Sequence, residues 1–161
     1  MAGRDTGVRG DLEWGTIPNL AAAAAERFGA DEAVVDGDVR LTFAELWSAA
    51  QQAGRAFMAA GGEPGGRGAI WSPNVHEGIV ALLGLQAAGG VLVPVNTRYK
   101  GAEAAYLLDT SRAKGLVTVN GFLGNDYLAM LEGHDLPHLA RTVVLRGDTP
   151  AGAQAWADFL A

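Results

Sequence analysis

The chain of 161 residues contains no cysteine and few positive charges. Without cysteine it can form no disulfide bond, no thiolate zinc site and no cysteine nucleophile. Its 12 lysines and arginines are outnumbered by 18 aspartates and glutamates, and the formal net charge is -6. The basic residues form no run, so we expect neither electrostatic binding of nucleic acid phosphates nor a nucleic acid partner.

Sequence motifs for phosphate loops and serine nucleophiles are also lacking. Neither GxxxxGK[ST] nor GxSxG occurs in the chain. The glycine-rich residues 61–68 follow a predicted helix and precede a predicted strand. A phosphate loop has the opposite order, because the amides at the start of the following helix bind the anion. We therefore interpret residues 61–68 as a surface connection.

One long apolar stretch, residues 78–95, contains a single strongly polar side chain, Gln86. The glycine pair at 89–90 and Pro94 interrupt it, which favours a buried helix followed by a buried strand over a membrane span. Charged side chains in residues 1–14 occupy the region where a secretory signal needs its apolar core. We expect no membrane span and a cytoplasmic location.

The length is typical of one domain or of one piece of a larger domain. Residues 1–15 are polar and lack periodicity, so we expect a flexible tail there and a domain at residues 16–161. Thr16 is placed to cap a first helix that has Pro18 in its first turn. Two short apolar runs flank the turn dipeptide Asp36-Gly37 and predict a hairpin of residues 33–35 and 39–41.

A second helix is predicted to begin after Thr42. Thr42 and Glu45 have the spacing of a capping box, in which each side chain accepts a hydrogen bond from the other residue's backbone amide. Apolar residues then recur with the helical period as far as Met58, and Gly61-Gly62 supplies a left-handed stop.

The rest of the chain alternates short apolar runs with helical patterns, which is typical of a parallel sheet covered by helices on both faces. We expect the run at residues 91–95 to be an interior strand. The predicted fold class is α/β, a mostly parallel sheet with an N-terminal hairpin. The predicted strands are residues 69–71, 91–95, 116–119 and 142–145, and the predicted helices are residues 75–88, 102–109, 122–131 and 154–160.

Candidate binding residues follow the predicted strand at 91–95. Asn96, Thr97 and Arg98 leave its carboxyl end, where open parallel sheets place their ligand crevices. They are candidates for contacting a substrate or for docking another subdomain. After the preceding strand, either Ser72 or Asn74 is expected to cap the next helix.

The three histidines have plain structural interpretations. His76 is expected on the surface at the start of a helix. His134, Asp135 and His138 could be metal ligands on one helix face, but Pro137 disfavours that helix and no further ligand cluster completes a coordination sphere. We expect a solvated loop there and no metal site.

Three segments in order resemble the AMP-forming acyl-CoA synthetases, also called adenylate-forming ligases. They are LTFAEL at 41–46, WSPN at 71–74 and LQAAGGVLVPVNTRY at 85–99. The resemblance implies the N-terminal part of the adenylate-forming ligase fold. Residues 96–108, NTRYKGAEAAYLL, are further similar to fatty-acid-CoA ligases, in particular those that activate the propanoate side chain left by steroid-ring breakdown.

This family resemblance implies a ligase reaction in two steps. ATP and a small carboxylic acid give an acyl-adenylate and pyrophosphate, and the thiol of CoA then displaces AMP, with Mg²⁺ neutralising phosphate charge. The family's phosphate loop, adenine and ribose motifs and C-terminal domain have no counterpart in this sequence. We therefore expect an incomplete AMP-binding domain that has no catalytic residue, binds none of these cofactors alone and is inactive without the C-terminal part of the ligase. The alternative is a free-standing, non-catalytic α/β binding or interaction module.

Overall fold

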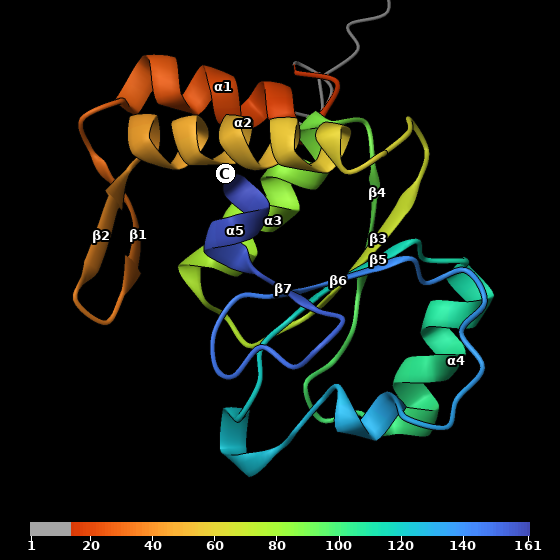
Figure 1. Ribbon diagram of the computed structural model, residues 1–161. Helices are drawn as coiled ribbons and strands as arrows, with labels where there is room; N and C mark the ends of the chain where they lie inside the picture. Colours follow the sequence, from red (N-terminus) through yellow and green to blue (C-terminus); the bar gives the residue numbers. More distant parts are fainter. Residues whose placement is uncertain (1–13) are drawn as a thin grey trace, which may run out of the picture.

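The computed structural model describes residues 14–161 (Figure 1). The expected tail at residues 1–15 therefore falls mostly outside the described residues. The helices are α1 (Ile17–Phe28), α2 (Phe43–Ala59), α3 (His76–Ala87), α4 (Gly101–Ser111) and α5 (Trp156–Leu160), with two 3-10 turns, η2 (Phe122–Gly124) and η3 (Ala129–Leu131). The strands are β1 (Glu32–Asp36), β2 (Val39–Thr42), β3 (Arg67–Trp71), β4 (Val91–Pro94), β5 (Gly115–Thr118), β6 (Arg141–Val144) and β7 (Gln154–Ala155).

The predicted α/β fold class is confirmed. Strands β1 and β2 form an antiparallel hairpin, and a second sheet has the order β4-β3-β5-β6-β7 with every neighbouring pair parallel. Figure 1 shows α2 and α3 on one side of the large sheet and α4 on the other. Helix α1 lies outside α2, so that the helical side has two layers. The predicted cover of helices on both faces is therefore present.

The first two helices begin where the sequence predicts. The Thr16 hydroxyl accepts from the amide of Asn19 at 3.2 Å. Thr42 and Glu45 form the full capping box, with the Thr42 amide 2.9 Å from the Glu45 carboxylate and the Glu45 amide 3.2 Å from the Thr42 hydroxyl. These contacts satisfy amides that have no partner inside the helix.

Helices α2 and α3 cross at unusually close range because small residues meet there. A Cβ atom added to Gly84 would lie 2.6 Å from the Cβ of Ala53 and 2.9 Å from the carbonyl oxygen of Ala50. Gly54 faces the same contact from α2, where an added Cβ would lie 3.2 Å from the carbonyl oxygen of Gly84. The crossing fixes α3, and with it the segments that precede and follow α3, against the sheet.

The large sheet changes direction at β3. From β3 the chain passes through α3 to β4 on one side, and then through α4 to β5 on the other side of β3. The order therefore reverses between β4 and β5, and later strands extend the sheet away from β4. Such a switch point, at the carboxyl ends of the strands, is where open α/β sheets form ligand crevices.

The prediction that residues 91–95 form an interior strand is wrong for the described chain, because β4 is an edge strand. Leu92 lines a groove on one face and Val93 packs against the core on the other, whereas Val91 is 48% exposed. The apolar side chains of residues 91–95 indicate that both faces of the strand are covered. They do not indicate whether another strand pairs with the backbone on each side. Pro94, which has no N–H to donate, suits an edge.

Two predicted helices differ from the structure. Residues 122–131 form two separate 3-10 turns, because Leu123 and Gly124 have φ values of 52° and 74° that no continuous α-helix contains. Residues 154–160 form a helix only from Trp156, since Gln154 and Ala155 pair with Val143 and Val144 of β6. In the hairpin the turn is Gly37-Asp38, because Asp36 still pairs with Val39.

In residues 14–161, no helix has both the length and the apolar character that crossing a membrane requires. The apolar stretch at residues 78–95 divides into α3 and β4, as the sequence predicts.

Candidate functional site

Four connecting segments with polar residues follow the carboxyl ends of the parallel strands. Residues 72–75 follow β3, residues 95–100 follow β4, residues 119–121 follow β5 and residues 145–148 follow β6. Because the strands are parallel, these segments all leave the sheet at the end where the strands finish. The switch point at β3 lies at this end of the sheet, which makes it the candidate functional site.

The predicted residues Asn96, Thr97 and Arg98 form a tight turn at this end of the sheet. The Asn96 side-chain oxygen accepts from the amide of Arg98 at 2.9 Å, and its backbone carbonyl accepts from the amide of Tyr99 at 3.0 Å. Asn96 and Arg98 are exposed, and Thr97 is half-buried. Asparagine is well suited to this position because its short amide can bond the backbone two residues ahead.

A groove of about 510 Å³ runs beside this turn. Asn96 and Thr97 line it together with Ser72 and Asn74, while Arg98 does not. The structure therefore brings two of the three predicted residues into one groove with the segment after β3. The remaining lining is mostly apolar and consists of Ile70, Pro73, Val75, Gly78, Ile79, Leu82, Leu92, Pro94 and Val95.

Two fully buried aromatic side chains lie behind the turn. Trp71 and Tyr127 are both 0% exposed, and their rings stack with centroids 4.3 Å apart. The indole Nε1 of Trp71 donates to the Asn96 carbonyl at 3.0 Å, and the hydroxyl of Tyr127 donates to the Thr97 carbonyl at 3.0 Å. Burial raises the pKa of Tyr127, so its hydroxyl remains a donor.

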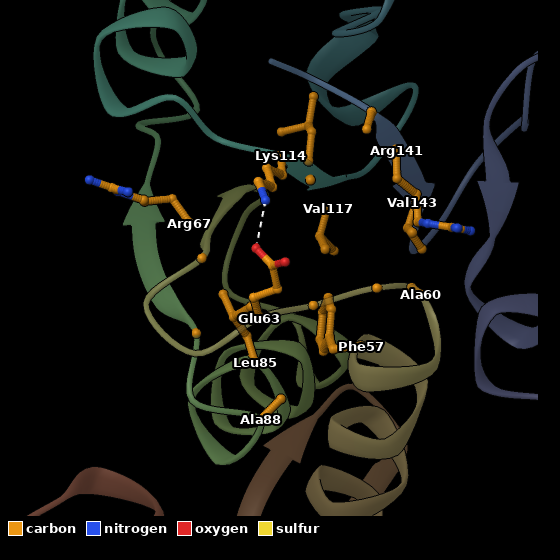
Figure 2. Close-up of a pocket in the computed structure, with 17 residues that line it drawn as sticks. Phe57, Ala60, Glu63, Arg67, Leu85, Ala88, Lys114, Val117, Arg141 and Val143 are labelled. Carbon is orange, nitrogen blue, oxygen red and sulfur yellow. Dashed lines mark hydrogen bonds and ion pairs between the residues drawn. The ribbon is translucent and has the colours of Figure 1, made fainter.

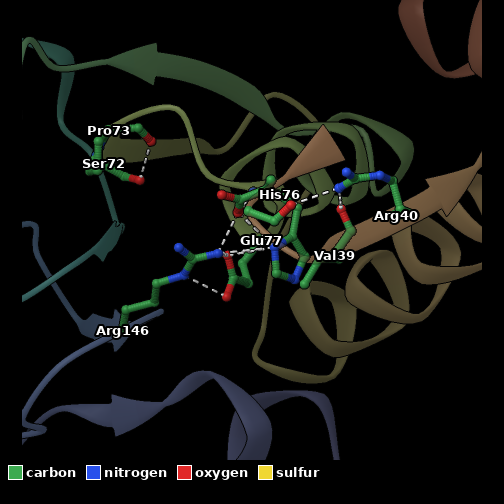
Figure 3. Close-up of polar contacts among 9 residues, drawn as sticks. Val39, Arg40, Ser72, Pro73, His76, Glu77 and Arg146 are labelled. Carbon is green, nitrogen blue, oxygen red and sulfur yellow. Dashed lines mark hydrogen bonds and ion pairs between the residues drawn. The ribbon is translucent and has the colours of Figure 1, made fainter. Parts of the chain in front are cut away.

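A cluster of four charged or titratable side chains lies at the start of α3 (Figure 3). Asp36 comes from the hairpin, His76 and Glu77 from the first turn of α3, and Arg146 from the segment after β6. Arg146 binds Glu77 through two nitrogens, at 2.8 and 2.7 Å, and also pairs with Asp36. The His76 ring nitrogen Nδ1 lies 2.9 Å from the Asp36 carboxylate.

The cluster also caps helix α3. The Asp36 carboxylate accepts from the His76 amide at 3.0 Å, and α3 has no cap from a side chain of its own N-cap residue, Val75. The prediction that Ser72 or Asn74 caps this helix is wrong, because the hairpin provides the cap across 40 residues of sequence. Hydrogen bonds from the amide and ring of His76, then from Arg146, hold the pKa of Asp36 far below its usual range.

Asp36, His76 and Glu77 have the spacing of metal ligands, with one ligand atom from each within 4.8 Å of the others. However, Arg146 lies between both carboxylates and already supplies a positive charge. Its pKa is raised chiefly by the hydrogen bond to Glu77. The arrangement is therefore an ion-pair cluster that joins hairpin, helix and sheet. His134, Asp135 and His138 lie in a loop, as predicted.

A second cavity, of about 170 Å³, lies at the amino ends of the strands, opposite the candidate site (Figure 2). Phe57 and Leu85 line it from the helical side, and Val117 and Val143 from the sheet. The ion pair between Lys114 and Glu63, at 2.9 Å, lies at this cavity. Its position at the amino ends of the strands is not where parallel sheets bind ligands.

Two places where backbone amides could bind a phosphate are already occupied by groups of the protein itself. In the loop after α2, the amides of Gly61, Gly62, Gly65 and Gly66 all donate to backbone carbonyls, so none points at a free anion. This confirms the interpretation of the loop as a surface connection. At the start of α3 the anion position is taken by the Asp36 carboxylate.

The sequence did not indicate the aromatic pair or the ion-pair cluster. Arg146 follows the strand at Arg141–Val144 just as Asn96 follows β4. This position after a strand could have marked Arg146 as a candidate for the same end of the sheet. His76 is in the predicted first turn but is half-buried rather than on the surface. Tyr127 lies between two 3-10 turns, in residues 122–131 that the sequence predicts as one helix, and that prediction did not identify it as buried.

Comparison with known proteins gives consistent results. The sequence model of the family described as AMP-binding enzyme matches residues 21–159. The 3-[(3aS,4S,7aS)-7a-methyl-1,5-dioxo-octahydro-1H-inden-4-yl]propanoyl:CoA ligase of Rhodococcus jostii (strain RHA1) is 40% identical over 151 residues, which cover 91% of this chain and 29% of that protein. The ligase of the same name from Mycobacterium tuberculosis (strain ATCC 25618 / H37Rv) is 37% identical over 146 residues, covering 91% of this chain and 28% of that protein.

Among solved structures, the anthranilate CoA ligase AuaEII in complex with anthranoyl-AMP aligns with a TM-score of 0.81 at 23% identity. The alignment covers 89% of this chain and 27% of that chain, and it shows a shared fold. This chain thus spans less than a third of the length of the ligases it matches. On the family match and the 40% identity, the chain belongs to the AMP-binding enzyme family, and the relatives named here are acyl-CoA ligases.

Proposed function

We propose that this chain is the N-terminal part of an ATP-dependent, AMP-forming carboxylic acid-CoA ligase. The observation that carries the proposal is the 40% identity over 151 residues to a ligase named for a fused-ring propanoate. In the proposed reaction the acid and ATP give an acyl-adenylate and pyrophosphate, and the thiol of CoA then displaces AMP. Adenylation is needed because a carboxylate oxygen is a poor leaving group, whereas AMP is a good one.

We propose that the acid is largely apolar, in the class of fatty or steroid-derived acids. Two relatives are named for the same fused-ring propanoate, which supports this class. The groove beside the Asn96 turn also supports it, because most of the residues that line it are apolar and the others carry neutral amide or hydroxyl groups. Asn96, Thr97 and Arg98 are proposed to contact the acid or the subdomain that docks at this end of the sheet.

The proposal assigns the chemical steps to chain beyond these residues. We propose that ATP, Mg²⁺ and CoA bind only when the rest of a ligase is present; the loop amides after α2 and the first amide of α3, which are already hydrogen-bonded within the protein, support this. Residues 16–161 would then be an incomplete AMP-binding domain whose role is to supply the sheet and one wall of the substrate region. A cytoplasmic location is part of the same proposal.

A chimeric ligase tests this function. The matched 151-residue segment of the Rhodococcus ligase would be replaced by the corresponding part of this chain. We expect the purified chimera to release pyrophosphate from ATP in the presence of the fused-ring propanoate and CoA, within about 100-fold of the parent enzyme, since 40% identity should retain part of the surface that docks the rest of the ligase.

Two controls accompany the chimera. The Rhodococcus ligase without the segment should be inactive, and this chain added separately should be compared with the covalent chimera. A chimera that melts cooperatively yet shows no acid-dependent pyrophosphate release would reject the proposal and favour a non-catalytic module. A chimera that does not fold would also count against it, because the segments would not be interchangeable.

A further inference from the structure

We infer that Trp71 and Tyr127 are positioning residues for the turn at residues 96–98, a role that depends on the proposed function of that turn. Each donates a hydrogen bond to a backbone carbonyl of the turn, and the two carbonyls belong to successive residues, Asn96 and Thr97. The donors come from the end of β3 and from the segment between η2 and η3. Three distant parts of the sequence thus meet at one turn.

The two hydrogen bonds are more specific than packing alone. Both aromatic side chains are 0% exposed, and a leucine or phenylalanine would fill such a position without a polar atom. A buried N–H or O–H is retained at a cost unless it finds an acceptor. Here the acceptors of both donors are carbonyls of the turn. The aromatic pair therefore fixes the path of the turn backbone.

Fixing the backbone also fixes the groove. Asn96 and Thr97 line one side of the groove, and Ser72 and Asn74 line it from the segment that follows Trp71. The indole of Trp71 therefore links the two polar walls, because its own strand continues into one wall and its nitrogen bonds the other. Loss of the Tyr127 donor removes the hydrogen bond to the Thr97 carbonyl, and loss of the Trp71 donor leaves the Asn96 carbonyl with the Tyr99 amide alone.

The first test uses this chain with the variants Trp71→Phe and Tyr127→Phe, which each remove one donor and keep an aromatic ring. Amide hydrogen exchange would be followed by NMR at Arg98 and Tyr99. The Tyr99 amide donates to the same Asn96 carbonyl that accepts from Trp71. We expect exchange of these two amides to become about three- to tenfold faster, the loss expected for one hydrogen bond.

Matched control variants are Trp47→Phe and Tyr106→Phe. Within the described residues neither side chain forms a hydrogen bond; Trp47 is half-buried in α2 and Tyr106 is 69% exposed in α4. The controls should leave exchange at Arg98 and Tyr99 unchanged. Unchanged exchange at Arg98 and Tyr99 in Trp71→Phe and Tyr127→Phe would overturn the inference. Amide exchange that is accelerated equally in all strands would also overturn it, because the pair would then contribute general stability only.

The second test places the same four substitutions in the chimeric ligase described above. We expect Trp71→Phe and Tyr127→Phe to raise KM for the acid about three- to tenfold and to change kcat less than about twofold, since the turn is proposed to hold the acid. The controls should change neither constant. A KM equal to that of the controls would overturn the positioning role. If the chimera without these substitutions is inactive, the proposed function is rejected. Hydrogen exchange in this chain then tests only whether Trp71 and Tyr127 hold the backbone of the turn.

Discussion

Asp36 shows how one side chain can serve three elements at once. It ends β1, accepts a hydrogen bond from the first amide of α3, and pairs with Arg146 from the segment after β6. A cap normally comes from the residue that precedes the helix, and here Val75 at that place has no polar side chain. The hairpin thereby replaces the missing local cap and is held against the sheet.

Stability should depend on the charge of Asp36. Its pKa is lowered in the folded protein, so the carboxylate stabilises the fold at neutral pH, and this contribution is lost as the pH falls below the ordinary value of about 4. We expect Asp36→Asn to lower the urea midpoint at pH 7 and to have a progressively smaller effect as the pH falls from about 4 to 2. Urea unfolding followed by circular dichroism across this range is the measurement.

The matched control for this residue is Asp38→Asn, which changes an exposed aspartate in the same hairpin turn. It should leave the midpoint at pH 7 nearly unchanged. If Asp36→Asn and Asp38→Asn gave the same midpoint at pH 7, the ion-pair cluster would contribute no stability. The exposed part of the Arg146 pair is weakened by salt, so the measurement belongs at low ionic strength.

At the scale of elements, the crossing of α2 and α3 determines where the site's segments lie. Helix α3 connects the segment after β3 with β4, and it is anchored by close contact with α2 at Gly84. The contact needs glycine because the nearest neighbours of an added Cβ are backbone atoms and a Cβ atom, which cannot rotate away.

Gly84→Ala is therefore expected to destabilise the chain. Helix propensity alone would favour alanine by about 1 kcal/mol. Against this, the new Cβ would lie 2.6 Å from Ala53 Cβ and 2.9 Å from backbone atoms, and overpacking of this kind costs about 1–3 kcal/mol. We expect a net loss in the free energy of unfolding, measured by urea denaturation.

Gly78→Ala is the control in the same helix. An added Cβ at Gly78 would meet the Ser72 hydroxyl oxygen at 3.4 Å and a Val75 methyl carbon at 3.6 Å, which are ordinary contacts. This variant should be neutral or more stable by up to about 1 kcal/mol. A Gly84→Ala variant as stable as Gly78→Ala would show that the two helices do not pack as closely as described.

At the scale of the whole molecule, the carboxyl ends of the parallel strands form a polar region, while two possible phosphate positions are occupied by protein groups in residues 14–161. The loop amides after α2 are used by backbone carbonyls, and the start of α3 is neutralised by Asp36. The ligases that this chain matches are more than three times as long, since it spans 29% and 28% of them. Binding and positioning of the nucleotide therefore fall to other segments in the proposed enzyme.

The chain by itself is accordingly expected to have no ligase activity. Pyrophosphate release from ATP would be measured with the fused-ring propanoate and with a medium-chain fatty acid, in the presence of Mg²⁺ and CoA. We expect no acid-dependent release above the blank without acid, because the proposal assigns charge neutralisation at the phosphates to the rest of the ligase. Acid-dependent turnover that persists after repurification would contradict this expectation.

Local features of the fold were predictable from sequence because their causes lie within a few residues. The capping box of Thr42 and Glu45 is a contact across three positions, and the apolar runs mark β3, β4, β5 and β6 without reference to any partner. The family resemblance has the same basis, since its three segments are short and occur in a fixed order. The turn at Asn96 was also marked, because its polar residues directly follow an apolar strand.

Only the tertiary structure decided which distant residues meet. The sequence marks Asp36 as a turn residue and Arg146 as a charge after a strand, but their contact spans 110 positions and depends on how the hairpin folds back. In the same way an apolar run cannot distinguish an edge strand from an interior one, because apolar side chains report covered faces while strand pairing uses the backbone. Hence the sequence determined most of the elements and the family resemblance, but it missed β7 and predicted one helix where two 3-10 turns form. The order of the strands, the cap of α3 and the aromatic support of the Asn96 turn depended on contacts that form only when the whole chain is packed.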